Sequence, residues 1–368
     1  MGLFISPGYL RRVMIIDFSE INHLTDPSFQ CLHADYEQFL LSLSGPSIID
    51  ITGLDESRTQ VITTLLQGNE PSGFIAIHRW LTERNIHDKP KTNLRFIICS
   101  VEPALKRPLF SHKMLPTGID LNRCFNTDKL AIQMNSNEDY YHQRAKVIEQ
   151  AIREVNPVTI VDLHNTSSPS PAYVISSAIT TDTLLLTSFF CQSLILSDLK
   201  IGSLIDLSFN CPFITVECGY AFDVQAHEIA YKGIVEIANT SSLSDITQEK
   251  TIDVKYQPLR LRLKEGVNIS FAEFDEGNRG ITLKSNIDYF NFGHIYEDEM
   301  IGWTDTNGLK NLELSDLRGK NIVDEYFYIR DNQLVCKHTY QLLKATTNIN
   351  SAKEDCLFYV VKVNGVKT

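Results

Sequence analysis

Short apolar runs that alternate with helix-like segments constrain the fold of this 368-residue chain more than any other feature. The runs lie in the first part of the sequence, at residues 47–51, 61–66, 94–99, 158–163 and 213–216. Runs of this length, with almost no alternation of polar side chains, are typical of strands buried on both faces, as in a parallel sheet. The first part of the chain is therefore predicted to contain such a sheet.

Apolar side chains at helical spacing separate or follow these runs, at residues 74–81, 141–155 and 224–237. In the second of these segments Tyr141, Ala145 and Ile148 share one helical face, and Asn156 with Pro157 ends it. Strands that alternate with helices predict an α/β fold, with a mixed, mostly parallel sheet and flanking helices.

A small, polar stretch at residues 238–245 predicts a linker. After it, short runs rich in β-forming residues alternate with turn signals such as Asn307-Gly308. The predicted strands cover residues 254–263, 280–283, 326–329, 334–337 and 357–363. We therefore predict an α/β domain over residues 1–240 and a smaller, β-rich domain over residues 246–368.

Charge and composition narrow the choice of partners. The chain has 34 basic and 45 acidic residues and a formal charge of −11, which argues against a nucleic-acid partner but still allows a local pocket to bind an anion. The longest apolar segment, residues 184–196, is too short and too polar to span a membrane. The eight cysteines include no Cys-x-x-Cys pair, which favours reduced thiols and a cytoplasmic protein.

Four polar clusters stand out, at residues 67–73, 120–125, 162–166 and 217–219. Three of them follow predicted strands, where open α/β sheets bind their ligands. Each cluster alone has an ordinary structural explanation. Asp162 and His164 face the same side of a strand, and in the structural explanation they form a hydrogen-bonded pair. In the same explanation Glu70 is a solvated carboxylate at the start of a helix. The combination is more informative than any one cluster.

Together the clusters resemble the motifs of the succinylglutamate desuccinylase/aspartoacylase family, a branch of the zinc carboxypeptidase-like hydrolases. In family order the matching segments are Gly68-Asn69-Glu70, Asp120-Leu121-Asn122-Arg123-Cys124-Phe125, Asp162-Leu163-His164-Asn165-Thr166 and Glu217-Cys218-Gly219. The resemblance implies a zinc carboxypeptidase-like fold, with a C-terminal β domain that narrows the entrance to the site.

The resemblance implies one Zn²⁺ per chain, with Glu70 and His164 as ligands and with Asp162 and Asn165 supporting them. The family has a further histidine ligand at the position of Gln67, whose amide oxygen is a poorer donor to zinc than imidazole. Three explanations remain open: Gln67 coordinates weakly, the metal site is degraded, or another histidine substitutes. The candidates for that substitution are His78, His87, His112 and His142.

The resemblance also implies how the reaction proceeds. Glu217 takes a proton from the attacking water and passes it to the leaving amine, while Arg123 and Asn122 hold a substrate carboxylate. Two basic residues of the aspartoacylase branch are absent, because their positions are Leu115 and Leu207. Compensation for the first by Lys113 or Arg107 stays open. Aspartoacylase or desuccinylase specificity is therefore not expected to carry over.

The leading hypothesis is a zinc-dependent hydrolase that cleaves an amide bond in a small carboxylate-bearing substrate, an N-acyl amino acid. A metallocarboxypeptidase that acts on short peptides is the first alternative. The second is a catalytically impaired homologue that binds carboxylate ligands or partners without turnover, which Gln67 motivates. Assembly into a homo-oligomer stays open.

Overall fold

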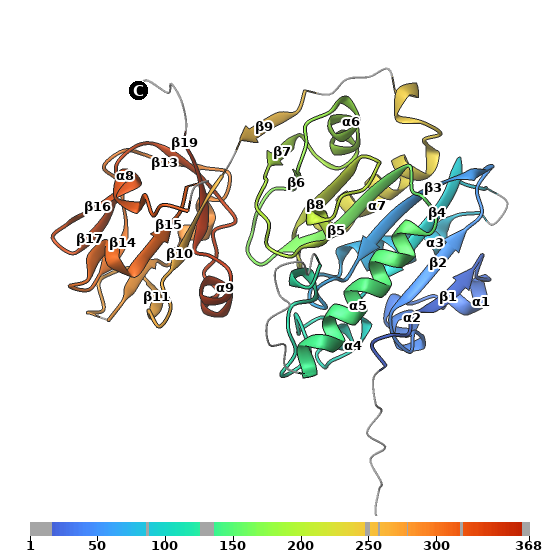
Figure 1. Ribbon diagram of the computed structural model, residues 1–368, viewed down its shortest axis with the longest axis horizontal. Helices are drawn as coiled ribbons and strands as arrows, with labels where there is room; N and C mark the ends of the chain where they lie inside the picture. The colour runs from blue at the N-terminus through green and yellow to red at the C-terminus, as the bar shows by residue number, and fades with distance from the viewer. Residues whose placement is uncertain are drawn as a thin grey trace, which may run out of the picture.

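The computed structural model describes residues 17–85, 88–125, 136–246, 251–256, 258–277, 279–316 and 319–362. Within these residues one nine-stranded sheet forms the centre of the first part of the chain (Figure 1). In order across the sheet its strands are β1 (Asn22–Thr25), β2 (Ser47–Ile51), β4 (Thr92–Ile98), β3 (Asp55–Thr64), β5 (Thr159–Thr166), β8 (Phe213–Tyr220), β6 (Tyr173–Ser176), β7 (Ser193–Leu196) and β9 (Asp253–Tyr256). Only the pairs β2–β4 and β6–β8 are antiparallel among these described strands, which confirms the predicted mixed, mostly parallel sheet.

Helices cover both faces of this sheet (Figure 1). They are α1 (Phe29–Leu32), α2 (Tyr36–Ser42), α3 (Ser72–Glu83), α6 (Thr181–Phe190) and α7 (Val224–Asn239) on one face, and α5 (Ser136–Arg153) on the other. Neighbouring residues of the central strands supply the two cores. Ile62 and Val161 pack with α3 and α7, while Val61 and Ile160 pack with α5. The strands are thus buried on both faces, which is why their sequences are nearly continuous apolar runs.

The three predicted helical segments correspond to α3, α5 and α7. Helix α5 ends at Arg153, three residues before Asn156, which takes a positive φ of 43° ahead of Pro157. Helix α6 was not expected, because its apolar side chains surround it instead of forming one stripe. In the part of the chain that the structure describes, no helix has both the length and the apolar character needed to cross a membrane.

Two five-stranded sheets make up the C-terminal part, as far as it is described, and enclose a core of their own. The first sheet contains β13 (His294–Ile295), β18 (Tyr340–Leu343), β19 (Phe358–Lys362), β10 (Leu259–Leu263) and β15 (Leu312–Leu314). The second contains β11 (Ile269–Ala272), β12 (Ile281–Lys284), β14 (Met300–Thr304), β17 (Gln333–Cys336) and β16 (Phe327–Arg330). The short helices α8 (Val323–Tyr326) and α9 (Ile349–Glu354) accompany them, and the β-rich character predicted for this part is confirmed.

The strand predicted at residues 254–263 is in fact two strands, β9 and β10, which belong to different sheets. β9 pairs in parallel with β7, so the chain returns to the large sheet after the predicted linker at residues 238–245. That stretch is the end of α7 followed by a short 3₁₀ turn, Leu243–Asp245. An apolar pattern does not reveal which sheet a strand joins, because pairing is decided by distant residues. We propose that the boundary between the two parts lies between Tyr256 and Leu259.

The C-terminal part contacts the large sheet where β8 ends and β6 begins. The rings of Tyr173 and Phe292 lie 5.0 Å apart between their centroids. The hydroxyl of Ser168 donates to that of Thr346 at 3.2 Å. These contacts bring side chains of the β-rich part to the carboxyl ends of β5 and β8, where ligands of α/β folds bind.

Candidate functional site

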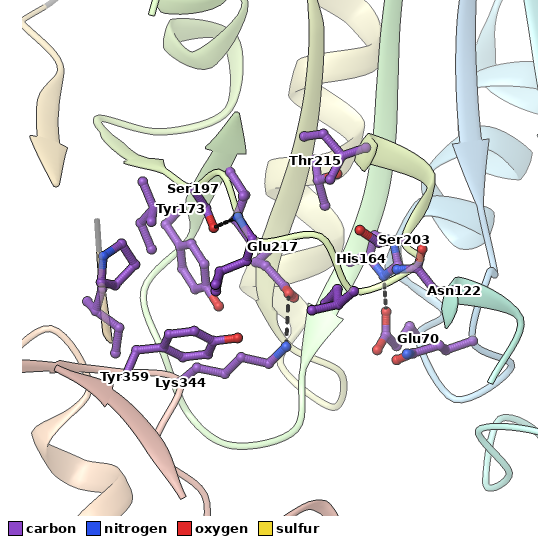
Figure 2. A pocket seen from close by; sticks show the side chains of 18 of the residues that line it. Glu70, Asn122, His164, Tyr173, Ser197, Ser203, Thr215, Glu217, Lys344 and Tyr359 are labelled. Atoms are coloured by element: carbon purple, nitrogen blue, oxygen red, sulfur yellow. Dashed lines mark hydrogen bonds and ion pairs between the residues drawn. The ribbon is translucent and has the colours of Figure 1, made fainter. Parts of the chain in front are cut away.

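One pocket at the carboxyl ends of β5 and β8 collects residues from both parts of the chain (Figure 2). From the first part it is lined by six of the residues singled out in the sequence: Gln67, Glu70, Asn122, Arg123, His164 and Glu217. From the C-terminal part it is lined by Pro258, Leu343, Lys344 and Tyr359. The structure therefore brings together segments that are about 300 residues apart in the sequence.

His164 lies between two carboxylates. Its Nδ1 is 2.6 Å from Oε2 of Glu70, and its Nε2 is 2.7 Å from Oδ2 of Asp162 on the same face of β5. Thr63 on the neighbouring strand β3 donates a hydrogen bond to the other oxygen of Asp162. Burial disfavours a charged ring, but Asp162 and Glu70 raise the pKa of His164 well above its ordinary value. In its protonated form the ring donates to both carboxylates, and in its neutral form one nitrogen is free to act as a metal ligand.

Asn165 fixes the position of Glu70 at the start of α3. Its backbone N–H donates to Oε2 of Glu70 at 3.2 Å. Its side-chain nitrogen donates to the Ser72 hydroxyl at 2.7 Å and to the carbonyl of Gly219 at 2.9 Å. One side chain thus links the beginning of α3 to the end of β8.

Glu217 is buried near the end of β8, and its Oε2 has no hydrogen-bond partner among the described residues. Burial raises the pKa of Glu217 to about 7, although the ammonium of Lys344 opposes the shift. That ammonium lies 3.9 Å from Oε1 of Glu217 (Figure 2). The register between β5 and β8 shifts just after Glu217, at Gly219, whose φ of 116° is a conformation that L side chains rarely adopt. A carboxyl group with such a pKa can both accept and donate a proton near neutral pH.

Gln67 lies in the pocket beside Asp120. Its Nε2 donates to Oδ2 of Asp120 at 2.8 Å, and Lys113 contacts the same oxygen at 2.9 Å. Burial opposes ionisation of Asp120, but Lys113 and Arg123 hold its pKa below the usual range. Lys113, which could have replaced the basic residue missing at Leu115, is thus paired with Asp120, and neither residue lines the pocket.

Asn122 and Arg123 belong to the single 3₁₀ turn Leu121–Arg123, which the Asp120 side chain caps. Oδ1 of Asn122 accepts from the backbone N–H of Leu204 at 2.9 Å. The guanidinium of Arg123 donates through one nitrogen to the backbone carbonyl of Asn122 at 2.8 Å, and its ion pairs with described residues are long, 3.9 Å to Asp120 and 3.7 Å to Asp355. Most of its donors therefore remain available to an anionic group in the pocket.

Sequence reasoning missed the contribution of the C-terminal part. Lys344 follows strand β18 with a φ of 55°, and its ammonium is 3.5 Å from Oδ2 of Asp355. Arg260 forms an ion pair with the same carboxylate. Burial opposes ionisation of Asp355, yet Lys344 and Arg260 hold its pKa well below the usual range. These residues lie in no motif, so no sequence signal connects them to Glu217.

No described histidine substitutes for the missing ligand. Nε2 of His78 contacts the carbonyl of Leu32 at 3.1 Å. His112 and His142 do not line the pocket either. His87 lies outside the described residues. Among the described candidates, the structure contradicts the explanation that another histidine takes the ligand position.

A catalytic zinc ion requires three protein ligands and one open position. In the described ranges, no group of three His, Cys, Asp or Glu side chains lies where it would hold a metal ion. Glu70 and His164 supply two donors of the usual kind, in mutual contact. Because Asp120 engages the amide nitrogen of Gln67, the amide oxygen is the third available donor. Two of these three donors are of the kind that a divalent cation ordinarily takes, and the third, an amide oxygen, is weak for zinc.

The sequence and the fold were also compared with known proteins. The family model of the succinylglutamate desuccinylase/aspartoacylase catalytic domain matches residues 57–231. A search of curated proteins gave no match.

Solved structures share the fold. Succinylglutamate desuccinylase of Vibrio parahaemolyticus matches with a TM-score of 0.58 at 13% identity, over 90% of this chain and 95% of its own. A succinylglutamate desuccinylase/aspartoacylase of Rhodobacter sphaeroides matches with a TM-score of 0.54 at 12% identity, over 87% and 89%. Murine aminoacylase 3 matches with a TM-score of 0.50 at 14% identity, over 84% and 96%. Residues 57–231 therefore form a catalytic domain of the succinylglutamate desuccinylase/aspartoacylase family.

Proposed function

We propose that this protein is a zinc-dependent hydrolase that cleaves the amide bond of a small N-acyl amino acid. The observation that carries the proposal is the convergence of Glu70, His164, Glu217 and Arg123 on one pocket at the carboxyl ends of two parallel strands. The family match supports hydrolysis, and the pocket lining contains a buried carboxylate, Glu217, and a guanidinium, Arg123.

Glu70, His164 and the amide oxygen of Gln67 are the residues that would hold one metal ion per chain, with Asp162 and Asn165 fixing their positions. When bound, such an ion lowers the pKa of water and polarises a carbonyl group.

Glu217 acts as general base and then as general acid. Its carboxylate removes a proton from the water that attacks the amide carbon, and it delivers this proton to the nitrogen as the carbon–nitrogen bond breaks. The products are a carboxylic acid and an amine. Lys344 favours the ionised form of Glu217 that the first step needs, because its ammonium opposes the effect of burial on the pKa.

Arg123 binds the carboxylate of the amino acid half through charge-assisted hydrogen bonds, and Asn122 lies next to it. Leu115 and Leu207, which stand where the aspartoacylase branch has basic residues, do not line the pocket. The proposal therefore does not include the substrates of aspartoacylase or of succinylglutamate desuccinylase.

The proposal is tested by measuring amine release from a panel of N-acyl amino acids and short peptides, with added Zn²⁺ and with a chelator. We expect hydrolysis of N-acyl amino acids that needs the metal ion and that falls in Arg123→Ala, mainly through a higher KM. Preferred cleavage of the peptides would favour a carboxypeptidase instead. Absence of turnover, with carboxylate binding that is lost in Arg123→Ala, would favour a non-catalytic binding protein.

Gln67→His is expected to raise the affinity for Zn²⁺ by at least about tenfold, because imidazole replaces an amide oxygen as the third donor. Gln67→Leu, the matched control, removes the donor and should lower the affinity. Isothermal titration calorimetry of the chelator-treated proteins with Zn²⁺ measures the affinity of each variant. Equal Zn²⁺ affinity in the wild type and both variants would show that position 67 does not contact the ion.

A further inference from the structure

The two ends of the pocket differ in chemistry (Figure 2). Glu70, His164 and Asn122 lie on one side of Glu217, whereas Tyr173 and Tyr359 lie on the other. On that second side, where Ser197 also lies, a hydrophobic cluster from β6, β7, β18 and β19 forms what we call the apolar end. It consists of Tyr173, Ile175, Ile195, Leu343 and Tyr359.

The apolar end is unsuited to a second carboxylate. Within the described residues, Arg123 and Lys344 are the only lysine and arginine side chains that line the pocket, and His164 lies between its own two carboxylates. Lys344 already contacts Glu217 and Asp355, whose charges it balances. A carboxylate placed among the aliphatic side chains would lose its hydration without gaining a counter-ion, whereas a hydrocarbon chain would gain from the same burial.

One unpaired donor lies within the apolar end. Tyr173 is only 1% exposed, and its hydroxyl has no hydrogen-bond partner among the described residues. A buried hydroxyl in an apolar environment is costly unless it is satisfied, so a ligand that brings a neutral oxygen acceptor is favoured there. The carbonyl oxygen of an acyl group is such an acceptor.

We propose that the acyl half of the substrate is an apolar chain of about four or more carbons, which occupies the apolar end while its carbonyl oxygen accepts from Tyr173. This assignment rests on the proposed function, in which Arg123 takes the carboxylate of the amino acid half. Asn122, which precedes Arg123 in the chain, lies on the opposite side of Glu217 from Tyr173 and Tyr359 (Figure 2), so we assign the acyl half to the apolar end.

The inference is tested by binding alone, so that failure of catalysis does not obscure it. In 4-oxoalkanoic acids a methylene replaces the amide nitrogen of an N-acylglycine, so these compounds keep the carbonyl and the carboxylate but have no carbon–nitrogen bond to cleave. Calorimetry on the purified wild-type protein with 4-oxopentanoate, 4-oxoheptanoate and 4-oxononanoate compares an acetyl, a butanoyl and a hexanoyl chain. We expect the Kd to fall about fourfold per methylene.

The diacid 4-oxoheptanedioate, which carries a succinyl chain, is expected to bind at least about tenfold more weakly than 4-oxoheptanoate, because its second carboxylate is desolvated. A Kd that is unchanged by chain length, or a diacid that binds as tightly as 4-oxoheptanoate, would overturn the inference. Chain-length dependence in a protein without turnover would leave the inference standing and refute only the proposed function.

Two variants test where the acyl chain and its carbonyl group bind in the pocket. Ile175→Ala is expected to weaken 4-oxononanoate about tenfold and 4-oxopentanoate less than about twofold, because only the longer chain reaches this side chain. Tyr173→Phe is expected to weaken all three monoacids by a similar factor, because they share the carbonyl. Leu54→Ala, at an exposed position outside the pocket, is the control and should leave every Kd unchanged.

Discussion

Glu217→Gln is expected to lower kcat for the hydrolysis of an N-acyl amino acid by about a thousandfold while changing KM little. Glutamine has nearly the same shape as glutamate and fills the same buried position, but it cannot accept the proton of the attacking water. Lys344 retains Asp355 as its partner in this variant, so the pocket should keep its arrangement. Steady-state kinetics with Zn²⁺ present measure the effect.

The matched control for this substitution is Glu83→Gln, which removes the same charge from the exposed ion pair with Arg79 on helix α3. It should leave kcat within about twofold of the wild type, because surface ion pairs contribute little. Circular dichroism and denaturant unfolding of both variants test whether the fold is intact. Undiminished activity in Glu217→Gln would refute the role assigned to this carboxylate.

Asp355→Asn is expected to lower the free energy of unfolding by about 3 kcal/mol, because it leaves a cluster of cations without their common counter-ion. Asp355 contacts Arg260 and Lys344 within the C-terminal part, and it reaches Arg123 in the first part. Its side chain is largely buried, so water compensates poorly for the lost charge. Urea unfolding of the metal-free protein at neutral pH measures the change.

Asp253→Asn is the control for this second prediction. It removes an aspartate from the pair with Lys255, where the aspartate side chain is 62% exposed, and should change stability by less than about 1 kcal/mol. If Asp355→Asn proved as mild as Asp253→Asn, the buried ion pairs would be shown to contribute little. In that case the contact between the two parts of the chain would depend on apolar packing, such as that of Tyr173 on Phe292.

Much of the first domain could be predicted because its signals are local. A strand buried on both faces requires a continuous apolar run, so residues 61–66 and 158–163 indicated β3 and β5 without knowledge of their neighbours. A helix on one face requires apolar side chains at helical spacing, which identified α5 and α7. The apolar run of residues 184–196 gave no such pattern, and it folds as helix α6 followed by strand β7.

The residues of the site also divide into those that a local sequence pattern indicated and those that it did not. Asp162 and His164 share one face of β5 by simple alternation, and their 2.7 Å contact follows from that geometry. The sequence also placed Glu217 and Arg123 among the candidates, and both line the pocket with His164. Nothing local connected Lys344, Asp355 or Tyr173 to them, because their approach depends on how the β-rich part packs on the sheet.

By itself, then, the amino-acid sequence determined the α/β class, the β-rich C-terminal part and the short segments that mark the family, since each of these depends on the spacing of neighbouring residues. Only the tertiary structure decided that β9 returns to the large sheet, that Lys344 lies beside Glu217 and that aliphatic side chains form one end of the pocket. The physical reason is that pairing between strands and burial of a pocket are interactions between residues far apart in the chain, whose partners no local pattern specifies.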